Sequence, residues 1–327
     1  MTGADWADAV AAVSGLPASA PVLLVCHVNP DGDALGSMLA FGLGLRRLGY
    51  RAVQASFPEP FEVTEPFLGL PGLDLLVPPA EAVAEPALFV CFDASSADRL
   101  GALAGRLAAP SVVVDHHASN TRFGKINLVD PAAAATTVLV AGLLDRLGVP
   151  LDRAIAECLY VGLVTDTGSF RYEATTPAVH ELAARLVATG IDVGTLSRRL
   201  FDTRPYAAVR LLAEAVGRIV LEPSAARGLG LAWTYATVDD LARYGQRPYA
   251  LEPLVDSVRA VAEADVAAVF KQVGPDGWAV SLRSRGGTDV SRVAVALGGG
   301  GHRLAAGFTG YGSLDRVLDA LRTVLDG

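Results

Sequence analysis

Residues that could bind metal ions follow three apolar runs in the first half of the chain. The segment HVNPDGD, residues 27–33, contains His27, Asp31 and Asp33 directly behind the apolar run 22–26. Asp93 follows a second run, and the tripeptide at 115–117, Asp-His-His, ends a third. Two like charges about 4 Å apart, at an effective dielectric constant near 20, repel by about 4 kcal/mol. Carboxylates gathered in one place would therefore need a bound cation.

The types of ligand indicate which cation. Carboxylate oxygens with a few imidazoles suit Mn²⁺ or Mg²⁺ better than zinc, which prefers thiolates, although iron or cobalt would also fit. Two ions about 3.5 to 4 Å apart, bridged by a shared carboxylate, would form a clamp for phosphoryl displacement. Such a pair would use all the available donors, which are more than one ion needs. They are His27, Asp31, Asp33, Asp93, Asp115, His116, His117 and Asp166.

Each segment also has a structural interpretation. NPDGD is typical of a turn whose aspartates cap a helix that starts near Ala34, and CFDASS fits a strand followed by a helix cap. Asp166 and Thr167 could end a helix before Gly168. The adjacent histidines are harder to explain in this way. Three of the five histidines in the chain lie beside acidic residues at predicted strand ends, and this co-occurrence favours the metal site.

The surrounding pattern predicts the elements that position these residues. Short β-branched runs at 21–27, 50–57, 87–94 and 110–117 alternate with helical patterns, which is typical of a parallel sheet covered by helices on both faces. Ligands collect at the carboxyl ends of parallel strands. We therefore expect the groups that follow these strands to converge. Further helices are predicted from near Ala132 and over 152–168, with Asp166 near the end of the latter.

The length of 327 residues and the hydrophobic content of 51% predict two domains. Residues 175–202 read as one or two helices interrupted at Gly190, so we place a first domain at 1–185, a helical linker at 186–212 and a second domain at 213–327. The second domain is predicted to be a smaller mixed sheet with helices. Its expected strands are 217–223, 228–237, 266–273 and 278–284, and its expected helices are 237–245 and 313–327.

Composition limits the partners. The formal net charge of −8 provides no field for a long polyanion, so a nucleic-acid substrate would have to be short. Three cysteines do not make a disulfide framework, which fits a reducing cytoplasm. The sequence lacks an apolar run of about 18 residues and its first residues are acidic, so we expect neither membrane insertion nor export.

Taken together, four segments in order resemble the motifs of the DHH phosphoesterase family. They are HVNPDGD, the aspartate of CFDAS, the DHH tripeptide and the aspartate of LVTDTGSF; downstream, SLRSRGG and GGGGHRLAAG resemble the DHH-associated C-terminal domain. The two-domain length without further extensions is similar to the stand-alone nanoRNase and pAp phosphatase group. That group includes phosphodiesterases that act on cyclic di-AMP and linear dinucleotides.

This resemblance implies roles for individual residues. It places His27 and Asp31 on one Mn²⁺, Asp33, His116 and Asp166 on a second, and Asp93 between them, with Mg²⁺ or Co²⁺ as other candidates. It implies that Asp115 orients the neighbouring imidazole and that His117 faces the scissile phosphate. Glycines and a bidentate arginine can grip a phosphate, although a flexible loop with surface arginines would look the same. The resemblance favours substrate binding by Arg283, Ser284, Gly299, Gly300, Gly301 and His302.

The expected protein is thus a Mn²⁺-dependent hydrolase of short nucleotides, with its active site in a cleft between an α/β DHH domain and a mixed α/β domain. Candidate substrates are pApA and other linear dinucleotides, oligoribonucleotides of a few units, cyclic di-AMP and pAp. One alternative is a family II-type pyrophosphatase or exopolyphosphatase, and another is a non-catalytic nucleotide sensor. A processive exonuclease like RecJ is disfavoured by the short, acidic chain. A homodimer is compatible with the apolar helix patterns.

Overall fold

The computed structural model describes residues 3–327 of the chain. The chain divides into two compact units, Met1–Asp202 and Thr203–Gly327. Each unit has its own sheet and its own hydrophobic core.

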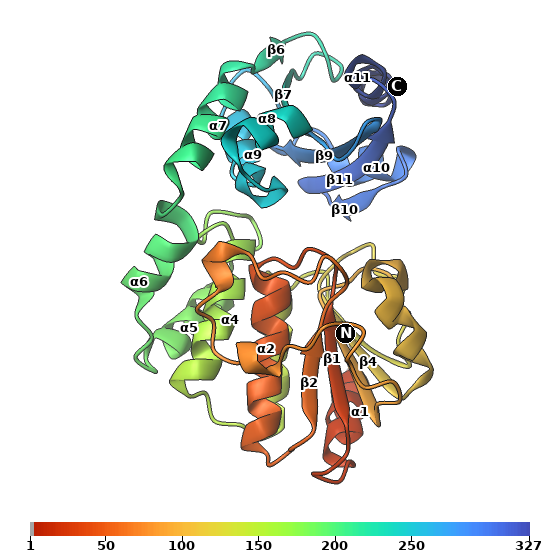
Figure 1. The fold of residues 1–327 in the computed structure, drawn as a ribbon, viewed down its shortest axis with the longest axis vertical. Helices are drawn as coiled ribbons and strands as arrows, with labels where there is room; N and C mark the ends of the chain where they lie inside the picture. The colour runs from red at the N-terminus through yellow and green to blue at the C-terminus, as the bar shows by residue number, and fades with distance from the viewer. Residues whose placement is uncertain (1–2) are drawn as a thin grey trace. The chain divides into compact units, whose positions relative to one another are not determined.

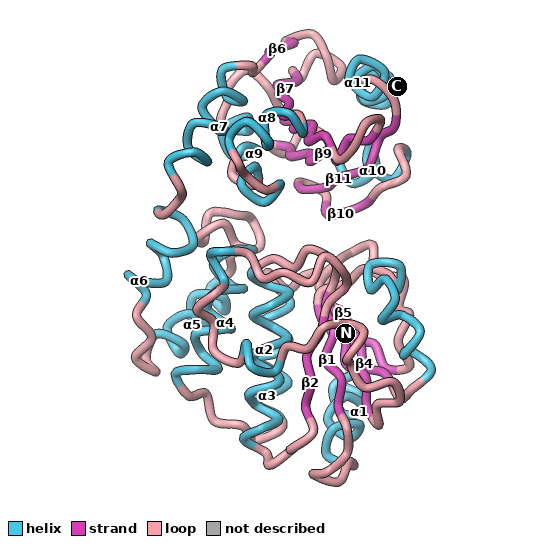
Figure 2. Tube along the Cα trace, viewed as in Figure 1, coloured by secondary structure: helices cyan, strands magenta, loops and turns pink. Residues whose placement is uncertain are grey.

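The first unit is built on a five-stranded parallel sheet with the strand order β2-β1-β3-β4-β5 (Figures 1 and 2). This confirms the predicted parallel sheet. The run at 126–129 was not among the predicted strands. The strands are β1 (Val22–Cys26), β2 (Val53–Ser56), β3 (Leu88–Phe92), β4 (Ser111–Asp115) and β5 (Ile126–Val129).

α-Helices pack on one face of this sheet, and where helices were also predicted on the other face, the structure has a 3-10 segment and loops. Val22 and Leu24 of β1 share a core with the α-helices, while Leu23 and Val25 face Leu100 and other residues of a 3-10 segment. Both faces of the central strands are therefore buried, which explains their continuous apolar sequences. The helices are α1 (Gly3–Ser14), α2 (Gly32–Arg47), α3 (Thr136–Arg146), α4 (Arg153–Asp166), α5 (Pro177–Val187) and α6 (Val193–Ser197), with 3-10 segments η1 (Glu65–Phe67), η2 (Leu73–Leu75) and η3 (Ala97–Ala108) and a π-turn, η4 (Arg198–Asp202).

One predicted helix starts later in the structure, and a predicted helix break is confirmed. The helix expected from near Ala132 begins at Thr136, because Ala135 is extended and Asp130 holds the amide of Ala132 in a turn at 3.0 Å. The predicted break at Gly190 is confirmed, since α5 ends three residues before it and α6 begins three residues after it.

The second unit contains a six-stranded sheet with the order β10-β11-β9-β8-β7-β6. Only β7 and β8 are parallel, so the predicted mixed sheet is confirmed. The pair β10 and β11 was not predicted, because its sequence is rich in glycine, which is rare in strands. The strands are β6 (Val220–Glu222), β7 (Leu231–Ala236), β8 (Val266–Gln272), β9 (Gly277–Ser284), β10 (Gly300–His302) and β11 (Ala305–Tyr311).

Helices cover both faces of the second sheet. One core joins the sheet to α10 and α11, and another joins it to α7, α8 and α9. Within residues 3–327, none of the helices combines the length and the apolar character that crossing a bilayer requires. The helices of this unit are α7 (Tyr206–Gly217), α8 (Val238–Tyr244), α9 (Leu254–Arg259), α10 (Val290–Ala296) and α11 (Leu314–Asp326), with a 3-10 turn, η5 (Pro248–Leu251).

Candidate functional site

The segment after β1 supplies three of the predicted side chains. His27 directly follows the strand and is buried. Asp31 is the N-cap of α2, and one of its oxygens accepts the amides of Asp33 and Ala34 at 3.0 Å each. Asp33 lies in the first helical turn and is fully buried. The capping interpretation of this motif is therefore correct for Asp31. The same residue also belongs to one of the groups of potential metal ligands described below.

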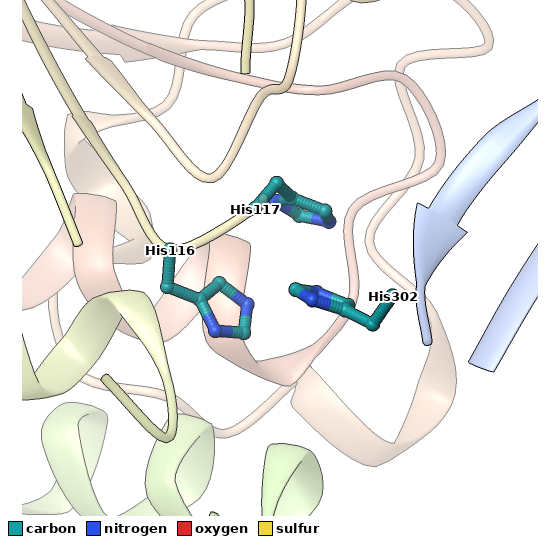
Figure 3. Close-up of side chains that lie close together, drawn as sticks. All are labelled: His116, His117 and His302. Atoms are coloured by element: carbon teal, nitrogen blue, oxygen red, sulfur yellow. The ribbon is translucent and has the colours of Figure 1, made fainter. Parts of the chain in front are cut away.

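The strands β3 and β4 end beside this segment. Asp93 follows β3 with a φ of 54°, a left-handed conformation that aspartate tolerates better than most residues. Asp115 is the last residue of β4, and His116 and His117 come directly after it. Figure 3 shows these two imidazoles side by side, and their ring centres are 5.0 Å apart. The predicted convergence of strand ends is confirmed.

Asp93 belongs to three groups of potential ligand atoms, two of which have the composition of a metal site. His27 Nε2 lies 3.4 Å from Asp93 Oδ2 and 3.9 Å from Asp31 Oδ2. On the other oxygen of Asp93, His116 Nε2 lies 3.6 Å from Oδ1 and 4.0 Å from Asp33 Oδ2. The ligand atoms within each group all lie within 4.8 Å of one another. Asp93 thus presents one oxygen to each group.

Asp166 joins the second group from the far side. It is the last residue of α4, and its Oδ2 lies 3.1 Å from His116 Nε2. Six of the predicted residues are therefore brought together although they span the sequence from 27 to 166. They are His27, Asp31, Asp33, Asp93, His116 and Asp166.

The N-terminus of α3 fixes two of these carboxylates, a role that was not predicted from the sequence. The amides of Thr136 and Thr137 donate to the two oxygens of Asp33 at 2.5 and 2.9 Å. The hydroxyl of Thr136 donates to Asp93 Oδ1 at 3.0 Å. A helix N-terminus stabilises negative charge, so α3 holds both acids in place. The apolar sequence of α3 carries no mark of this role, because it depends mainly on backbone amides.

Backbone carbonyls orient two of the imidazoles. His27 Nδ1 lies 2.8 Å from the carbonyl of Val28, and His116 Nδ1 lies 3.2 Å from that of Ala133. Each Nδ1 must carry a proton to make this bond, so in the neutral ring Nε2 presents a lone pair to the carboxylates. Lone pairs facing carboxylates repel unless a proton or a metal ion lies between them. The donor set therefore fits a divalent cation in each group.

The electrostatics agree with this assignment. Burial raises the pKa of Asp33 well above its usual range, and the charges of Asp93 and Asp166 raise it further. Burial acts in the same direction on Asp93, but hydrogen bonding to His27 and the neighbouring imidazoles outweigh it and lower that pKa. For His116, burial disfavours the charged ring, yet the carboxylate of Asp166 raises the pKa well above its usual value. The site attracts positive charge, whether protons or metal ions.

Asp115 and His117 form a third group with Asp93. Asp115 is fully buried, and its Oδ1 lies 2.7 Å from His117 Nδ1. His117 is more exposed than His116, and its Nδ1 also lies 3.6 Å from Asp93 Oδ1. A carboxylate on Nδ1 fixes the tautomer of an imidazole and raises its basicity. This geometry suits an acid or base beside the candidate metal ligands.

The substrate residues predicted at the C-terminal side lie in the second unit. Arg283 is half-buried on β9, and Gly300, Gly301 and His302 form β10. Gly301 has a φ of 138°, and a Cβ on Gly299 would collide with the backbone of β11. These glycines are therefore required for the approach of β10 to β11, whether or not they also face a phosphate.

Ser284 has a structural task in the same unit. It is buried, and its hydroxyl donates to Asp265 at 3.2 Å and accepts the amide of Gly286 at 2.9 Å. Asp265 also accepts the amide of Gly287 at 2.9 Å. The pair shapes the loop 284–288, which carries Arg285.

Comparison with known proteins agrees with both halves of the chain. Residues 21–163 match the N-terminal domain of the DHH family. Residues 232–327 match the DHHA1 domain. The first match covers all five strands of the first sheet, and the second covers β8 to β11 and most of β7, while β6 lies outside it.

Individual proteins are similar over nearly the whole chain. A bifunctional oligoribonuclease and PAP phosphatase from Thermus thermophilus is 36% identical over 98% of this chain and 93% of its own. Its counterpart from Bacillus subtilis is 27% identical over 93% of this chain and 94% of its own. The crystal structure of an exopolyphosphatase-related protein from Bacteroides fragilis superimposes with a TM-score of 0.86 at 22% identity, covering 99% of this chain and 96% of that one, so the fold is shared.

Proposed function

Because this chain belongs to the DHH family and ends in a DHHA1 domain, we propose that it is a metal-dependent phosphoesterase that hydrolyses short nucleotides. The relatives named above as oligoribonucleases and PAP phosphatases support this substrate class. Within it, we propose linear dinucleotides such as pApA and the bisphosphate pAp as main substrates, with cyclic di-AMP and RNAs of a few units as further ones.

The observation that carries the proposal is the sharing of Asp93 by two groups of ligand atoms. A carboxylate with one oxygen in each group is the arrangement that a pair of closely spaced cations requires. His27 and Asp31 would hold one Mn²⁺, and Asp93 would bridge it to the other. The second ion would be held by Asp33, His116 and Asp166. Mg²⁺ or Co²⁺ could replace Mn²⁺ on the same oxygen and nitrogen donors.

Such ions would supply Lewis-acid stabilisation of the phosphoryl oxygens and an activated water molecule. The protein's own contribution is to hold the groups around the phosphate. Asp115 keeps a proton on Nδ1 of His117, so Nε2 is the nitrogen that can exchange a proton with the substrate. His117 would donate that proton to the leaving oxygen or stabilise charge on the phosphate.

The second unit would bind the rest of the nucleotide. Arg283 offers a planar guanidinium that can take two phosphate oxygens at once. Arg285 is exposed on the loop that Ser284 and Asp265 shape, and His302 lies on β10. We propose that Arg283 and His302 contact substrate phosphates directly and that Ser284 acts by shaping this loop.

A product analysis tests the proposal. The full-length protein is stripped with a chelator, reloaded with Mn²⁺, Mg²⁺ or Co²⁺, and incubated with pApA, pAp, cyclic di-AMP and pyrophosphate. We expect AMP from pApA, and AMP with inorganic phosphate from pAp, only in the reloaded samples. Each product is quantified by chromatography.

Two results would contradict the proposal. Faster release of phosphate from pyrophosphate than from any nucleotide would assign the protein to the pyrophosphatase alternative. Recovery of every nucleotide intact, with tight binding of one of them, would indicate a sensor.

A further inference from the structure

We propose that Asn120 positions the Asp115–His117 pair for catalysis. Asn120 is none of the expected metal ligands or substrate residues, and it lies three residues after His117 in a loop. This inference rests on the proposed function, and it adds a residue that sets the orientation of the group facing the phosphate.

Both the amide nitrogen and the amide oxygen of Asn120 are hydrogen-bonded. Its amide nitrogen donates to Asp115 Oδ2 at 2.6 Å and to the carbonyl of Ala94 at 3.0 Å. Its amide oxygen accepts the backbone N–H of Arg122 at 2.6 Å. Its backbone N–H donates to the carbonyl of His117 at 3.1 Å. An amide is the side chain that supplies two donors and an acceptor from one planar group.

Asn120 completes the set of partners of a fully buried carboxylate. Asp115 Oδ1 is bonded to His117 Nδ1, and Asp115 Oδ2 is bonded to Asn120. With both oxygens held, the plane of the carboxylate cannot turn, and the imidazole keeps its direction. Without Asn120, one buried oxygen would lose its donor, and a buried acceptor without a partner drives the side chain to rearrange.

Asn120 also joins two loops of the site. Ala94 directly follows Asp93, and the neighbouring Thr121 donates its amide to the carbonyl of Ser95 at 2.9 Å. These bonds tie the loop carrying His117 to the loop that follows Asp93. His117 Nδ1 and Asp93 Oδ1, one beside each of these loops, lie 3.6 Å apart.

A double-mutant cycle tests the inference. Asn120→Ala, His117→Ala and the double variant are assayed with Mn²⁺ and pApA under single-turnover conditions, so that slow residual rates are measured. We expect Asn120→Ala to lower the rate about 10- to 100-fold, as loss of the group behind a functional histidine does. In the His117→Ala background we expect a further loss of less than about threefold, because residues that act through one another are not additive.

Asn127→Ala is the matched control. The amide of Asn127 also makes two bonds, both to the backbone of Gly124, and neither reaches Asp115. We expect Asn127→Ala to retain the wild-type rate within about threefold. Bound metal and thermal midpoint are measured for every variant, and Asn120→Ser, whose hydroxyl is too short to bridge the same partners, replaces Asn120→Ala if the latter does not fold.

The outcomes separate the two proposals. Absence of hydrolysis by the wild-type protein would refute the proposed function. An active wild type with equal losses from the Asn120 substitution in the presence and absence of His117 would overturn the positioning role. A loss of bound metal matching the loss of rate would overturn it too, because Asn120 would then act on the ligands.

Discussion

Asp93 is the residue on which the two ligand groups depend. Its Oδ2 faces His27 and its Oδ1 faces His116. The hydroxyl of Thr136 also donates to Oδ1. Its left-handed φ of 54° places the side chain at the junction. Asparagine tolerates this backbone conformation as well as aspartate does. A neutral, nearly isosteric replacement therefore changes the charge at the junction with little backbone strain.

We predict that Asp93→Asn folds but binds Mn²⁺ at least about 100-fold more weakly, since a lost ligand should cost more than a lost supporting residue. Turnover of pApA should fall with it. Calorimetric titration of the chelator-treated protein measures the affinity, and circular dichroism checks the fold. Asp276→Asn, in an exposed turn of the second unit, is the control for the same chemical change. Unchanged metal affinity in the Asp93 variant would contradict the ligand assignment.

At the residue scale, the sequence predicted the gathering of the acids and imidazoles but not their supports. His27, Asp93 and Asp115 could be placed because each follows an apolar strand, and strand ends meet at one edge. Thr136 and Asn120 could not, because a hydroxyl or amide in a loop or helix start looks the same with or without a buried carboxylate beside it. Their roles depend on contacts between residues up to 103 positions apart in the sequence.

At the element scale, the site depends on how closely α2, α3 and α4 approach one another. Asp33 lies on α2, its amide donors belong to α3, and Gly162 of α4 packs against it. A Cβ placed on Gly162 would lie 2.8 Å from Asp33 Oδ1 and would collide with the methyl group of Thr137. The helices can therefore meet at this point only because glycine has no side chain.

We predict that Gly162→Ala destabilises the first unit by about 1–3 kcal/mol, as overpacking of a tight core does. It should also weaken metal binding, because the added methyl group displaces Asp33. Gly105→Ala in η3 is the control, since its Cβ would meet nothing within 4 Å. Urea unfolding and metal titration measure the two effects. A Gly162→Ala variant as stable as Gly105→Ala, with native affinity, would show that Asp33 does not need this close approach.

Elements with strong periodic patterns were predictable, and those defined by their neighbours were not. Continuous apolar runs predicted β1, β3 and β4 because both faces of these strands are buried. The strands β10 and β11 consist largely of glycine and alanine, and they are defined by pairing: β11 pairs with β9, and β10 pairs with β11. The first residue of α3, Thr136, bonds to Asp33 of α2 and to Asp93, which follows β3, and these tertiary contacts leave no pattern in the sequence.

At the scale of the whole molecule, an ion pair should make the stability of the second unit depend on pH. Asp240 is buried beside Arg218, whose guanidinium donates to both carboxylate oxygens at 2.5 and 2.9 Å. The Arg218 bonds lower the pKa of Asp240 well below its usual value, and the amide of Thr237 lowers it further. A lowered pKa means that the ionised form stabilises the fold above the unfolded-state pKa, near about 3.9, and that this contribution is lost as pH falls through the folded pKa.

We predict that Asp240→Asn lowers the free energy of unfolding by about 1–3 kcal/mol at pH 7, the range for hydrogen bonds to charged groups. The difference from wild type should be constant down to about pH 5 and should shrink below about pH 4. Tryptophan fluorescence during urea unfolding measures it, because Trp233 and Trp278 both lie in the second unit. A difference that grows toward acid pH would contradict the assigned ion pair.

The charge of the whole chain predicts how substrate length affects hydrolysis. The net charge of −8 repels long polyanions, while Arg283, Arg285 and Arg303 lie on or beside β9 and β10. Few phosphates can therefore be neutralised at once. For two or three such contacts on a single strand, the logarithm of the binding constant should fall against the logarithm of salt concentration with a slope no steeper than about −2.

We expect pApA to be hydrolysed at least about tenfold more efficiently than a 24-nucleotide RNA, because the additional phosphates of the long RNA are repelled by the protein and have no basic partners. Initial rates for RNAs of increasing length at several salt concentrations measure both the length preference and the salt dependence. Processive degradation of the long RNA, with a salt-dependence slope of about −5, would contradict the prediction, because it would require a continuous basic surface for nucleic acid.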